Sequence, residues 1–416
     1  MLDINKIRKD FPQLTLHFGE ENHYLDAAAT SLTPQAVLDS VVDYYTHNRA
    51  NVHRGLFKEA LQATALYEDA RKRVAAFINA SPDEIIFTSG ATESSNMIVR
   101  MLEESDMIFT PNIPHSEPGA KKEIVTTVME HHGALVPLQQ FAVRRDLPLH
   151  VIPLKDIALD YEKAKELITH NTAIVSVMLA SNVTGTINDV AAIAKITHAH
   201  DALLLVDATA AAGHIPIDVK ALECDALYFS GHKMLAPTGV GVLWVKKDLL
   251  KQLPPSVFGG HMVDRMENGR AKWADIPTRF EAGTKNIAAV IGLGAAIDYI
   301  NAIGLDNIKT YIGELTAYAI SELEAIPGVK VVSEHDVSQN VGIASFSCEW
   351  AHPHDVAEII ARDLVAVRAG HHCAIPYHGA LGIASTVRAS FHVYNTKKDI
   401  DALVAAVVKV KEIFSN

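Results

Sequence analysis

Strand-like apolar segments alternate with helical patterns over the first two thirds of the chain. This alternation constrains the fold, because successive parallel strands need a long crossover between them, and that crossover is usually a helix. The sequence therefore predicts an α/β protein with a mainly parallel sheet flanked by helices. The expected strands are residues 84–88, 124–128, 149–152, 173–178, 203–206, 226–229 and 240–245, and the expected helices include 34–45, 59–78 and 190–200.

The pattern changes after residue 286, where a long helical stretch precedes a shorter mixture of strands and helices. At 416 residues the chain also exceeds an ordinary single core. We therefore expect an N-terminal segment (1–20) that joins a small lobe, a large domain (21–286), and a connecting helix with a small α+β domain (287–416). The expected elements of the small domain are a helical stretch at 287–326, strands at 329–332 and 341–346, and helices at 353–363 and 397–414. Two aperiodic stretches, 109–122 and 254–283, are expected to be irregular, the first as an insertion.

The charge and the apolar pattern exclude several classes of protein. The net charge of −12 argues against nucleic-acid binding, which needs a basic surface. No apolar run approaches the roughly 18 residues of a membrane span, and the charged start does not resemble a signal peptide. The three cysteines, Cys224, Cys348 and Cys373, are odd in number and scattered, which is typical of a reducing compartment. We expect a cytoplasmic enzyme.

Lys233 ends the motif Ser230-Gly231-His232-Lys233, directly after a strand-like run. Burial there would lower the pKa of the amine, and a neutral amine can form an imine with a carbonyl group. Asp207 follows the preceding strand-like run. Pyridoxal phosphate needs these two groups, because a carboxylate keeps its pyridine nitrogen protonated. The alternative is an exposed loop lysine beside an unrelated aspartate.

Residues 88–93 form a strand-to-helix turn that contains Gly90, Ala91 and Thr92. Amides at a helix N-terminus, together with hydroxyl groups, can bind a phosphate, and Ser230 and His232 would add further contacts. An ordinary capped turn is the alternative interpretation.

Two further polar residues follow predicted strands. His131, in Glu130-His131-His132, would stack on a cofactor ring or belong to a structural histidine pair, and Asn182 follows the strand at 173–178. Ligands of open α/β sheets bind at the carboxyl ends of the strands, so these residues are expected to converge on one site.

A guanidinium, two imidazoles and a thiol occur together in the segment from Arg368 to Cys373. Positive neighbours lower the pKa of a thiol and favour the nucleophilic thiolate. His371, His372 and Cys373 are also zinc-ligand types, but the other cysteines lack the paired spacing of a zinc site, so no metal is expected. Arg388 lies in a strand-like apolar run and is interpreted as a carboxylate clamp, or alternatively as a structural ion pair.

Together these motifs resemble the class V aminotransferase family of pyridoxal-phosphate enzymes, in particular SufS-type cysteine desulfurases. The resemblance runs from about residue 24 to the C-terminus. It implies fold type I of the pyridoxal-phosphate-dependent transferases, with the cofactor bound by the large domain. The motifs are Asn51-Val52-His53-Arg54-Gly55, Glu130-His131-His132, residues 181–185, Ser230-Gly231-His232-Lys233, residues 279–284, residues 368–373 and Arg388-Ala389-Ser390.

The resemblance also implies a role for each matched residue. Lys233 would carry pyridoxal 5'-phosphate, Asp207 would pair with its ring nitrogen, and His131 would stack on the ring. Further cofactor contacts are assigned to Ala91, Thr92, Asn182, Ser230, His232 and Thr284. Substrate contacts are assigned to Arg388, Asn182, Arg368, His53 and Arg54. Thr284 would reach the phosphate of the neighbouring subunit, which implies a homodimer.

The implied reaction removes sulfur from L-cysteine, releases L-alanine and leaves a persulfide on Cys373. A sulfur-acceptor protein of the SufE or SufU type would then take the sulfur, for iron–sulfur cluster assembly or another pathway. The alternatives are a selenocysteine lyase acting on L-selenocysteine, a C–S lyase or epimerase, and a non-catalytic scaffold.

The chain departs from the family pattern at one position in the cofactor site. The family usually has Asp-x-x-Gln, in which the glutamine donates to the ring oxygen, whereas this chain has Asp207-Ala208-Thr209-Ala210. Ala210 offers no such donor, so either Asn182 or a water would replace it, or the electronics of the cofactor would be shifted.

Overall fold

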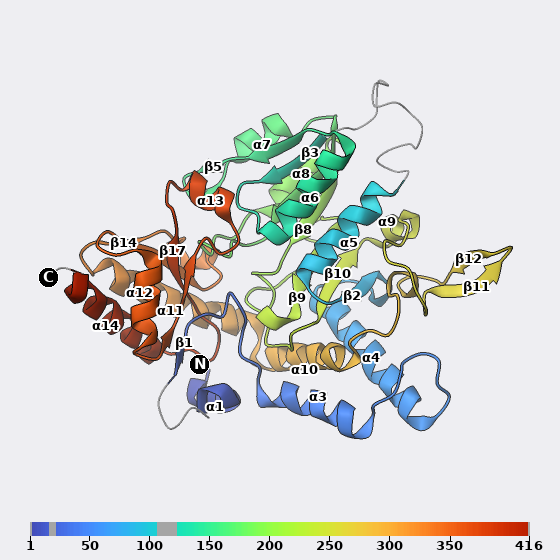
Figure 1. Ribbon diagram of the computed structural model, residues 1–416, viewed down its shortest axis with the longest axis horizontal. Helices are drawn as coiled ribbons and strands as arrows, with labels where there is room; N and C mark the ends of the chain where they lie inside the picture. The colour runs from blue at the N-terminus through green and yellow to red at the C-terminus, as the bar shows by residue number, and fades with distance from the viewer. Residues whose placement is uncertain (1, 16–21, 106–122, 415–416) are drawn as a thin grey trace.

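A seven-stranded sheet forms the centre of the large lobe, in the order β2-β10-β9-β8-β7-β3-β4 (Figure 1). The computed structural model describes residues 2–15, 22–105 and 123–414. β10 runs antiparallel to both of its neighbours and the other pairs are parallel, which confirms a mainly parallel sheet. The strands are β2 (Ile85–Thr88), β3 (Glu123–Thr127), β4 (Leu149–Ile152), β7 (Thr172–Met178), β8 (Leu203–Asp207), β9 (Ala226–Ser230) and β10 (Gly241–Val245).

Helices cover both faces of this sheet and bury a separate hydrophobic cluster on each. Along β9, Leu227 and Phe229 belong to one cluster, whereas Ala226 and Tyr228 belong to the other. Side chains alternate between the faces of a strand, so a strand covered on both faces is apolar throughout. One face is covered by α3 (Gln35–His47), α4 (Lys58–Phe77), α8 (Val190–His198) and α10 (Ile287–Ile303), and the other by α5 (Ala91–Glu103), α6 (His132–Arg145) and α9 (Lys247–Gln252).

The small lobe is a four-stranded antiparallel sheet in the order β13-β14-β17-β16, with α11 and α12 packed against it and α14 packed on these two helices (Figure 1). The N-terminal helix α1 (Ile4–Lys9) attaches to this lobe, where Arg8 Nη1 lies 2.9 Å from Asp399 Oδ2. The elements are β13 (Val329–Val331), β14 (Ile343–Cys348), β16 (Arg368–Gly370), β17 (Thr386–Ser390), α11 (Leu305–Glu324), α12 (Pro353–Ala361), α13 (Ile375–Ala380) and α14 (Lys397–Phe414).

The remaining elements are short and lie at the edges of the two lobes. β1 pairs in parallel with β15, and β5 pairs with β6. Their bounds are α2 (Pro12–Thr15), β1 (His23–Tyr24), β5 (Leu154–Lys155), β6 (Ala158–Leu159), α7 (Tyr161–Leu167) and β15 (Val365–Ala366).

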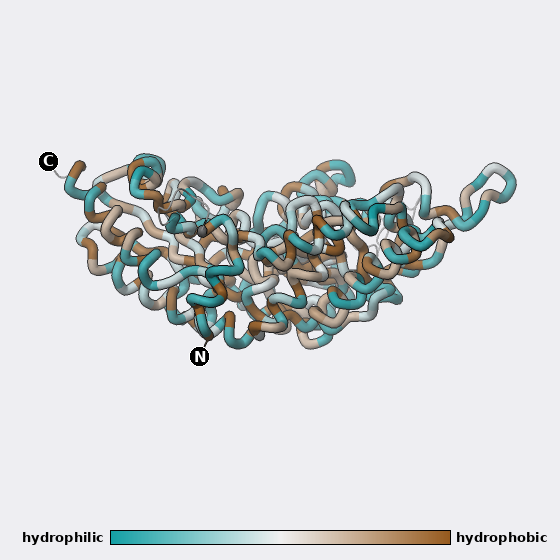
Figure 2. The backbone as a smooth tube through the Cα atoms, turned by 90° about the horizontal axis from the view of Figure 1, so that it is seen from below, coloured by the Kyte–Doolittle hydropathy of each residue, from teal (hydrophilic) through white to brown (hydrophobic). Residues whose placement is uncertain are grey.

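Two expectations about secondary structure were wrong. The helical stretch at 287–326 is broken at Gly304, whose φ of 88° ends α10, and α11 leaves at a bend of 75°. The stretch at 254–283 contains a hairpin, β11 (Val263–Glu267) and β12 (Arg270–Trp273), which extends from one end of the molecule (Figure 2). Its strands are mostly exposed, so they lack the apolar pattern that reveals a buried strand. The expected insertion at 109–122 lies outside the described residues.

No single helix among the described residues has the length and hydropathy of a membrane span. The bent pair α10 and α11 passes that test only when the two helices are joined. α10 packs against α3 and α4, and most of its residues are buried within the protein.

We predict that Gly241→Ala lowers the free energy of unfolding by about 1–3 kcal/mol, as overpacking substitutions do. A Cβ atom at Gly241 would lie 2.4 Å from the Cα atom of Gly90, so the turn between β2 and α5 would have to move. Urea unfolding measures the loss. Gly260→Ala is the control, because nothing lies within 4 Å of its added Cβ. Equal stability of the two variants would contradict the prediction.

Candidate active site

A cavity of about 250 Å³ lies at the carboxyl ends of the central strands, where residues of the small lobe close it. Asp207 and Ser230 end β8 and β9, and Arg388 comes from β17. This is the edge at which open α/β sheets bind ligands. Most of the predicted site residues line it, namely Ala91, Thr92, His131, Asn182, Asp207, Ser230, His232, Lys233, Arg368, Cys373 and Arg388.

Three predicted site residues do not reach this cavity. His53, Arg54 and Thr284 line a separate pocket of about 210 Å³, together with Lys285. His53 has a φ of 71°, and its Nε2 lies 2.8 Å from Glu68 Oε1. Within one chain His53 and Arg54 therefore do not reach the cavity, and their assignment to substrate binding stays a prediction. Thr284 was assigned to the neighbouring subunit, which a single chain does not test.

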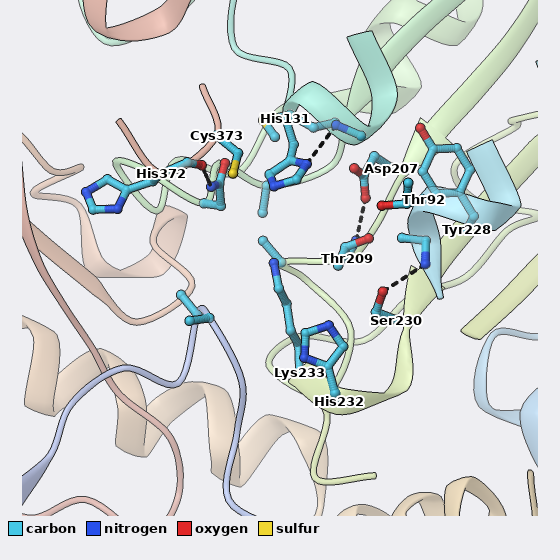
Figure 3. A pocket seen from close by; sticks show the side chains of 18 of the residues that line it. Thr92, His131, Asp207, Thr209, Tyr228, Ser230, His232, Lys233, His372 and Cys373 are labelled. Carbon is cyan, nitrogen blue, oxygen red and sulfur yellow. Dashed lines mark hydrogen bonds between the residues drawn. The ribbon is translucent and has the colours of Figure 1, made fainter. Parts of the chain in front are cut away.

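The Lys233 amine points into the cavity from the short helical turn Gly231–Lys233 after β9 (Figure 3). Burial, together with the positive charge of Arg388, lowers the pKa of this amine from 10.5 to about 8. A much larger fraction of Lys233 than of an ordinary lysine is therefore neutral near pH 7, and the neutral form is the nucleophile and the base.

Two carboxyl groups belong to the site. Asp207 lines the cavity, and Glu130 is buried behind it. Asp207 Oδ1 accepts a 2.8 Å hydrogen bond from the backbone of Thr209. Glu130 is fully buried, and burial, with a contribution from Asp207, raises the pKa of its carboxyl group to about 8. Glu130 Oε1 accepts hydrogen bonds of 2.8 Å each from the Met178 amide and the Thr127 hydroxyl. Glu130 thus fixes the end of β7, which pairs with Asp207.

His131 lies over the cavity as the N-cap of α6 (Figure 3). Its Nδ1 accepts a 2.9 Å hydrogen bond from the Gly133 amide, so the neutral ring carries its proton on Nε2. Burial and the neighbouring Lys233 lower the pKa of His131 to about 4. The imidazole is consequently neutral at pH 7 and suited to stacking on an aromatic ring.

The turn between β2 and α5 presents amide and hydroxyl groups at the far end of the cavity. Gly90 is the N-cap of α5, and the Ala91 amide donates a 2.8 Å hydrogen bond to Ser230 Oγ. Thr92 and His232 also line the cavity. Burial lowers the pKa of His232 to about 4, with a contribution from Lys233. Backbone amides at a helix N-terminus favour a bound anion.

These groups fit a small aromatic cofactor that carries a carbonyl and a phosphate group. Two cavity-lining polar atoms, Asn182 Oδ1 and Thr209 Oγ1, are buried and have no partner among the described residues. Buried polar atoms normally have hydrogen-bond partners, so an orphaned pair facing a cavity indicates a ligand. The Lys233 amine with its lowered pKa, the Asp207 carboxylate and the N-terminus of α5 supply its three remaining contacts.

Cys373 lies on a compact loop after β16, and its thiol lies beside His131 (Figure 3). The carbonyl groups of the loop are held from the large lobe: the His132 amide donates to Cys373 O and Asn182 Nδ2 donates to His372 O, both at 2.7 Å. His372 and Cys373 have φ values of 49° and 56°. The left-handed region costs a residue with a side chain about 1–3 kcal/mol, so these contacts maintain a strained conformation.

Arg388 is buried and shares an acidic partner with Arg368. Its Nη1 donates to the Asn182 carbonyl at 2.8 Å and its Nη2 lies 3.2 Å from Asp26 Oδ1. The other oxygen of Asp26 lies 3.0 Å from Arg368 Nη2. Arg388 therefore forms the structural ion pair, and it also lines the cavity, where its role as a carboxylate clamp stays a prediction.

Sequence reasoning missed Asp26, Glu130 and Thr209. Glu130 carried a usable signal, since it is an acidic residue directly after an apolar strand. Asp26 gave none, because its partner Arg388 is 362 positions away. Thr209 stands next to Ala210, and both line the cavity. Its orphaned hydroxyl is a candidate, beside Asn182, for the hydrogen bond that Ala210 lacks.

We predict that the Lys233 amine of the cofactor-free protein titrates with a midpoint near pH 8. Reductive methylation with ¹³C-formaldehyde, followed by NMR at several pH values, measures the midpoint. Arg388→Gln removes a neighbouring positive charge, so the midpoint should rise. Arg362→Gln, at an exposed position, is the control and should leave it unchanged. A midpoint of about 10.5 in the parent protein would show that burial does not control this amine.

Comparisons with known proteins place the chain in a family. The model of the class V aminotransferases matches residues 23–403. A probable cysteine desulfurase of Streptomyces coelicolor is 44% identical over 418 residues, covering 100% of this chain and 98% of the relative. A probable cysteine desulfurase of Halalkalibacterium halodurans is 43% identical and is covered completely, as is this chain.

Solved structures agree with these sequence relatives. The apo cysteine desulfurase of Thermococcus onnurineus has a TM-score of 0.89 and 38% identity, with 100% of this chain and 99% of that chain covered. The cysteine desulfurase CsdA of Escherichia coli has a TM-score of 0.89 and 35% identity, with both chains covered completely. This protein belongs to the class V aminotransferase family.

Proposed function

We propose that this protein is a pyridoxal-phosphate-dependent cysteine desulfurase, which converts L-cysteine into L-alanine and holds the sulfur as a persulfide on Cys373. One observation carries the proposal: a single cavity contains the Lys233 amine, the Asp207 carboxylate, the Arg388 guanidinium and the Cys373 thiol. The first three suit amino-acid chemistry on a carbonyl cofactor, and the thiol adds a sulfur acceptor. Relatives of full length that are named cysteine desulfurases support the same reaction.

Class V aminotransferases use pyridoxal phosphate, and the residues of this cavity suit it. Lys233 would hold the carbonyl carbon, Asp207 the ring nitrogen and His131 the face of the ring. Bound pyridoxal phosphate supplies an electron sink that eases bond breaking at the substrate α-carbon. The phosphate contacts would come from Ala91, Thr92, Ser230 and His232.

Arg388, Arg368 and Lys233 would act directly on the amino acid. The two guanidinium groups bind the substrate carboxylate and orient the α-carbon toward the Lys233 amine. With its lowered pKa, that amine can remove the α-proton and return a proton near neutral pH.

Cys373 would complete the transfer of sulfur. Its thiolate attacks the sulfur atom of the substrate, and a sulfur–sulfur bond forms as the bond between that sulfur and the β-carbon breaks. The electron pair of the broken bond stays with the carbon fragment, which takes up a proton at the β-carbon and leaves as L-alanine. Cysteine and a thiol become alanine and a persulfide, so the reaction balances without an oxidant or a reductant.

The position of Cys373 supports transfer of the sulfur to another protein. The residue is exposed, and the neighbouring Ile375 side chain is 55% exposed, which offers an apolar contact beside the thiol. We propose an acceptor of the SufE or SufU type, with iron–sulfur assembly as the destination of the sulfur. A reducing compartment, the cytoplasm, would keep the three free cysteines reduced.

A homodimer would explain the separate pocket that contains Thr284. His53, Arg54 and Lys285 make this pocket basic, and the adjacent side chains of Leu56 and Phe57 are 91% and 59% exposed. Exposed apolar side chains beside a polar site are typical of protein interfaces. We propose that this surface meets a second copy and that Thr284 reaches the phosphate bound in the partner.

We predict that the reconstituted protein releases L-alanine from L-cysteine and that Cys373→Ala loses almost all of this activity. The thiol of Cys373 is the only proposed acceptor for the substrate sulfur. Alanine is quantified with a thiol reductant present, and Cys348→Ala is the control because Cys348 lies outside the cavity. Alanine from both Cys373→Ala and the parent would indicate a lyase, and alanine from neither would exclude the cysteine assignment.

We also predict that the double variant Leu56→Asp, Phe57→Asp sediments as a monomer, whereas the parent sediments as a dimer. Two carboxylates cannot be buried unpaired in an apolar interface. Val143→Asp, at a side chain that is 73% exposed on α6, is the matched control and should remain dimeric. A monomeric parent protein in analytical ultracentrifugation would contradict the proposal.

A further inference from the structure

Arg368 and Arg388 occupy directly opposed positions on the antiparallel strands β16 and β17. Like charges at such positions repel each other and destabilise a sheet. Arg388 is also buried, which makes its uncompensated charge expensive. Two arginines at these positions therefore require anionic partners between them.

Asp26 supplies one of these partners. Its Oδ1 lies 3.2 Å from Arg388 Nη2, and its Oδ2 lies 3.1 Å from Arg368 Nε and 3.0 Å from Arg368 Nη2. Each carboxylate oxygen of Asp26 therefore pairs with a different arginine. The contact with Arg368 engages two nitrogens of one guanidinium, which fixes the orientation of that group.

The backbone around Asp26 holds this carboxylate in place. Asp26 forms a bridge with Ser390, two residues after Arg388 on the same strand. The Ser390 amide donates a 2.8 Å hydrogen bond to Leu25 O, and the Ala28 amide donates a 2.9 Å bond to Ser390 Oγ. The backbone on both sides of Asp26, at Leu25 and Ala28, is therefore tied to Ser390 of β17, which places the carboxylate beside the arginine pair.

The cluster keeps one unit of positive charge after this compensation. Two guanidinium groups and one carboxylate leave a charge of +1, and Arg388 Nε has no partner among the described residues. One further carboxylate, bound from the cavity, would neutralise the cluster. A ligand with two acidic groups would leave a negative charge in a partly buried site, which is unfavourable.

We propose that Asp26 is a positioning residue that limits the arginine pair to a single carboxylate and so selects amino acids without an acidic side chain. Asp26 neutralises one of the two guanidinium charges, so the arginine pair retains the positive charge for one carboxylate, the α-carboxylate of the substrate. Without Asp26, Arg368 is free to bind a second acidic group, such as the side-chain carboxylate of L-aspartate. The inference rests on the proposed function, because it assumes that the arginine pair binds the substrate carboxylate.

Calorimetric titration of the holoenzyme with L-alanine and with L-aspartate tests this role, since neither ligand carries sulfur. We expect the parent to prefer L-alanine. Asp26→Asn should shift the ratio of the two dissociation constants by about tenfold toward L-aspartate, the size expected of a close charge pair. Asp26→Glu keeps the charge and should keep the parent ratio, as should Asp363→Asn, which removes an exposed partner of Lys409.

An unchanged ratio in Asp26→Asn, or the same shift in Asp26→Glu, would overturn the proposal. Arg368→Gln gives an independent test should Asp26→Asn fail to fold. It removes one positive charge but leaves Asp26 paired with Arg388, so affinity for L-alanine should fall without any gain for L-aspartate. Unchanged L-alanine affinity in Arg368→Gln would also overturn it. Binding needs no turnover, so failure of the desulfurase reaction would be a separate result.

Discussion

The chemistry of this protein depends on placing several charged groups out of water at one edge of a sheet. A buried charge is tolerated only if it is paired or neutralised. Burial makes the Lys233 amine a weak base, and the raised pKa of Glu130 favours its protonated form behind Asp207. Arg388 keeps its charge because Asp26 pairs with it. The same desolvation that would destabilise an ordinary core thus prepares a base, a carboxylate and an anion site.

Buried charges in the structure that supports the cavity are also paired. Arg71 and Glu281 are both buried and form a two-point ion pair, with contacts of 2.9 and 3.0 Å. Glu281 Oε1 also accepts a 2.7 Å bond from the Phe87 amide of β2. This pair joins α4 and β2 to the segment that precedes α10. It therefore anchors the strand that leads into the turn at Gly90 and Ala91.

The sequence predicted the sheet well because each central strand is buried on both faces and reads as an apolar run. It also predicted the convergence of Asp207, Ser230 and Lys233, since each directly follows or ends such a run. It could not predict the hairpin β11–β12, whose exposed strands carry no apolar pattern. Nor could it place His53 or join Asp26 to Arg388, because the direction of a turn and contacts between distant segments depend on the folded chain.

The position of Cys373 suits a thiol that would take sulfur inside the cavity and pass it to an acceptor in solvent. Residues of both lobes line the cavity. Cys373 lies at the boundary, exposed to solvent yet lining the cavity. Its loop is held by backbone contacts from His132 and Asn182, and Asn182 also accepts a bond from Arg388 through its carbonyl. Asn182 therefore contacts both Arg388, the proposed substrate-binding group, and the loop of Cys373, the proposed sulfur acceptor.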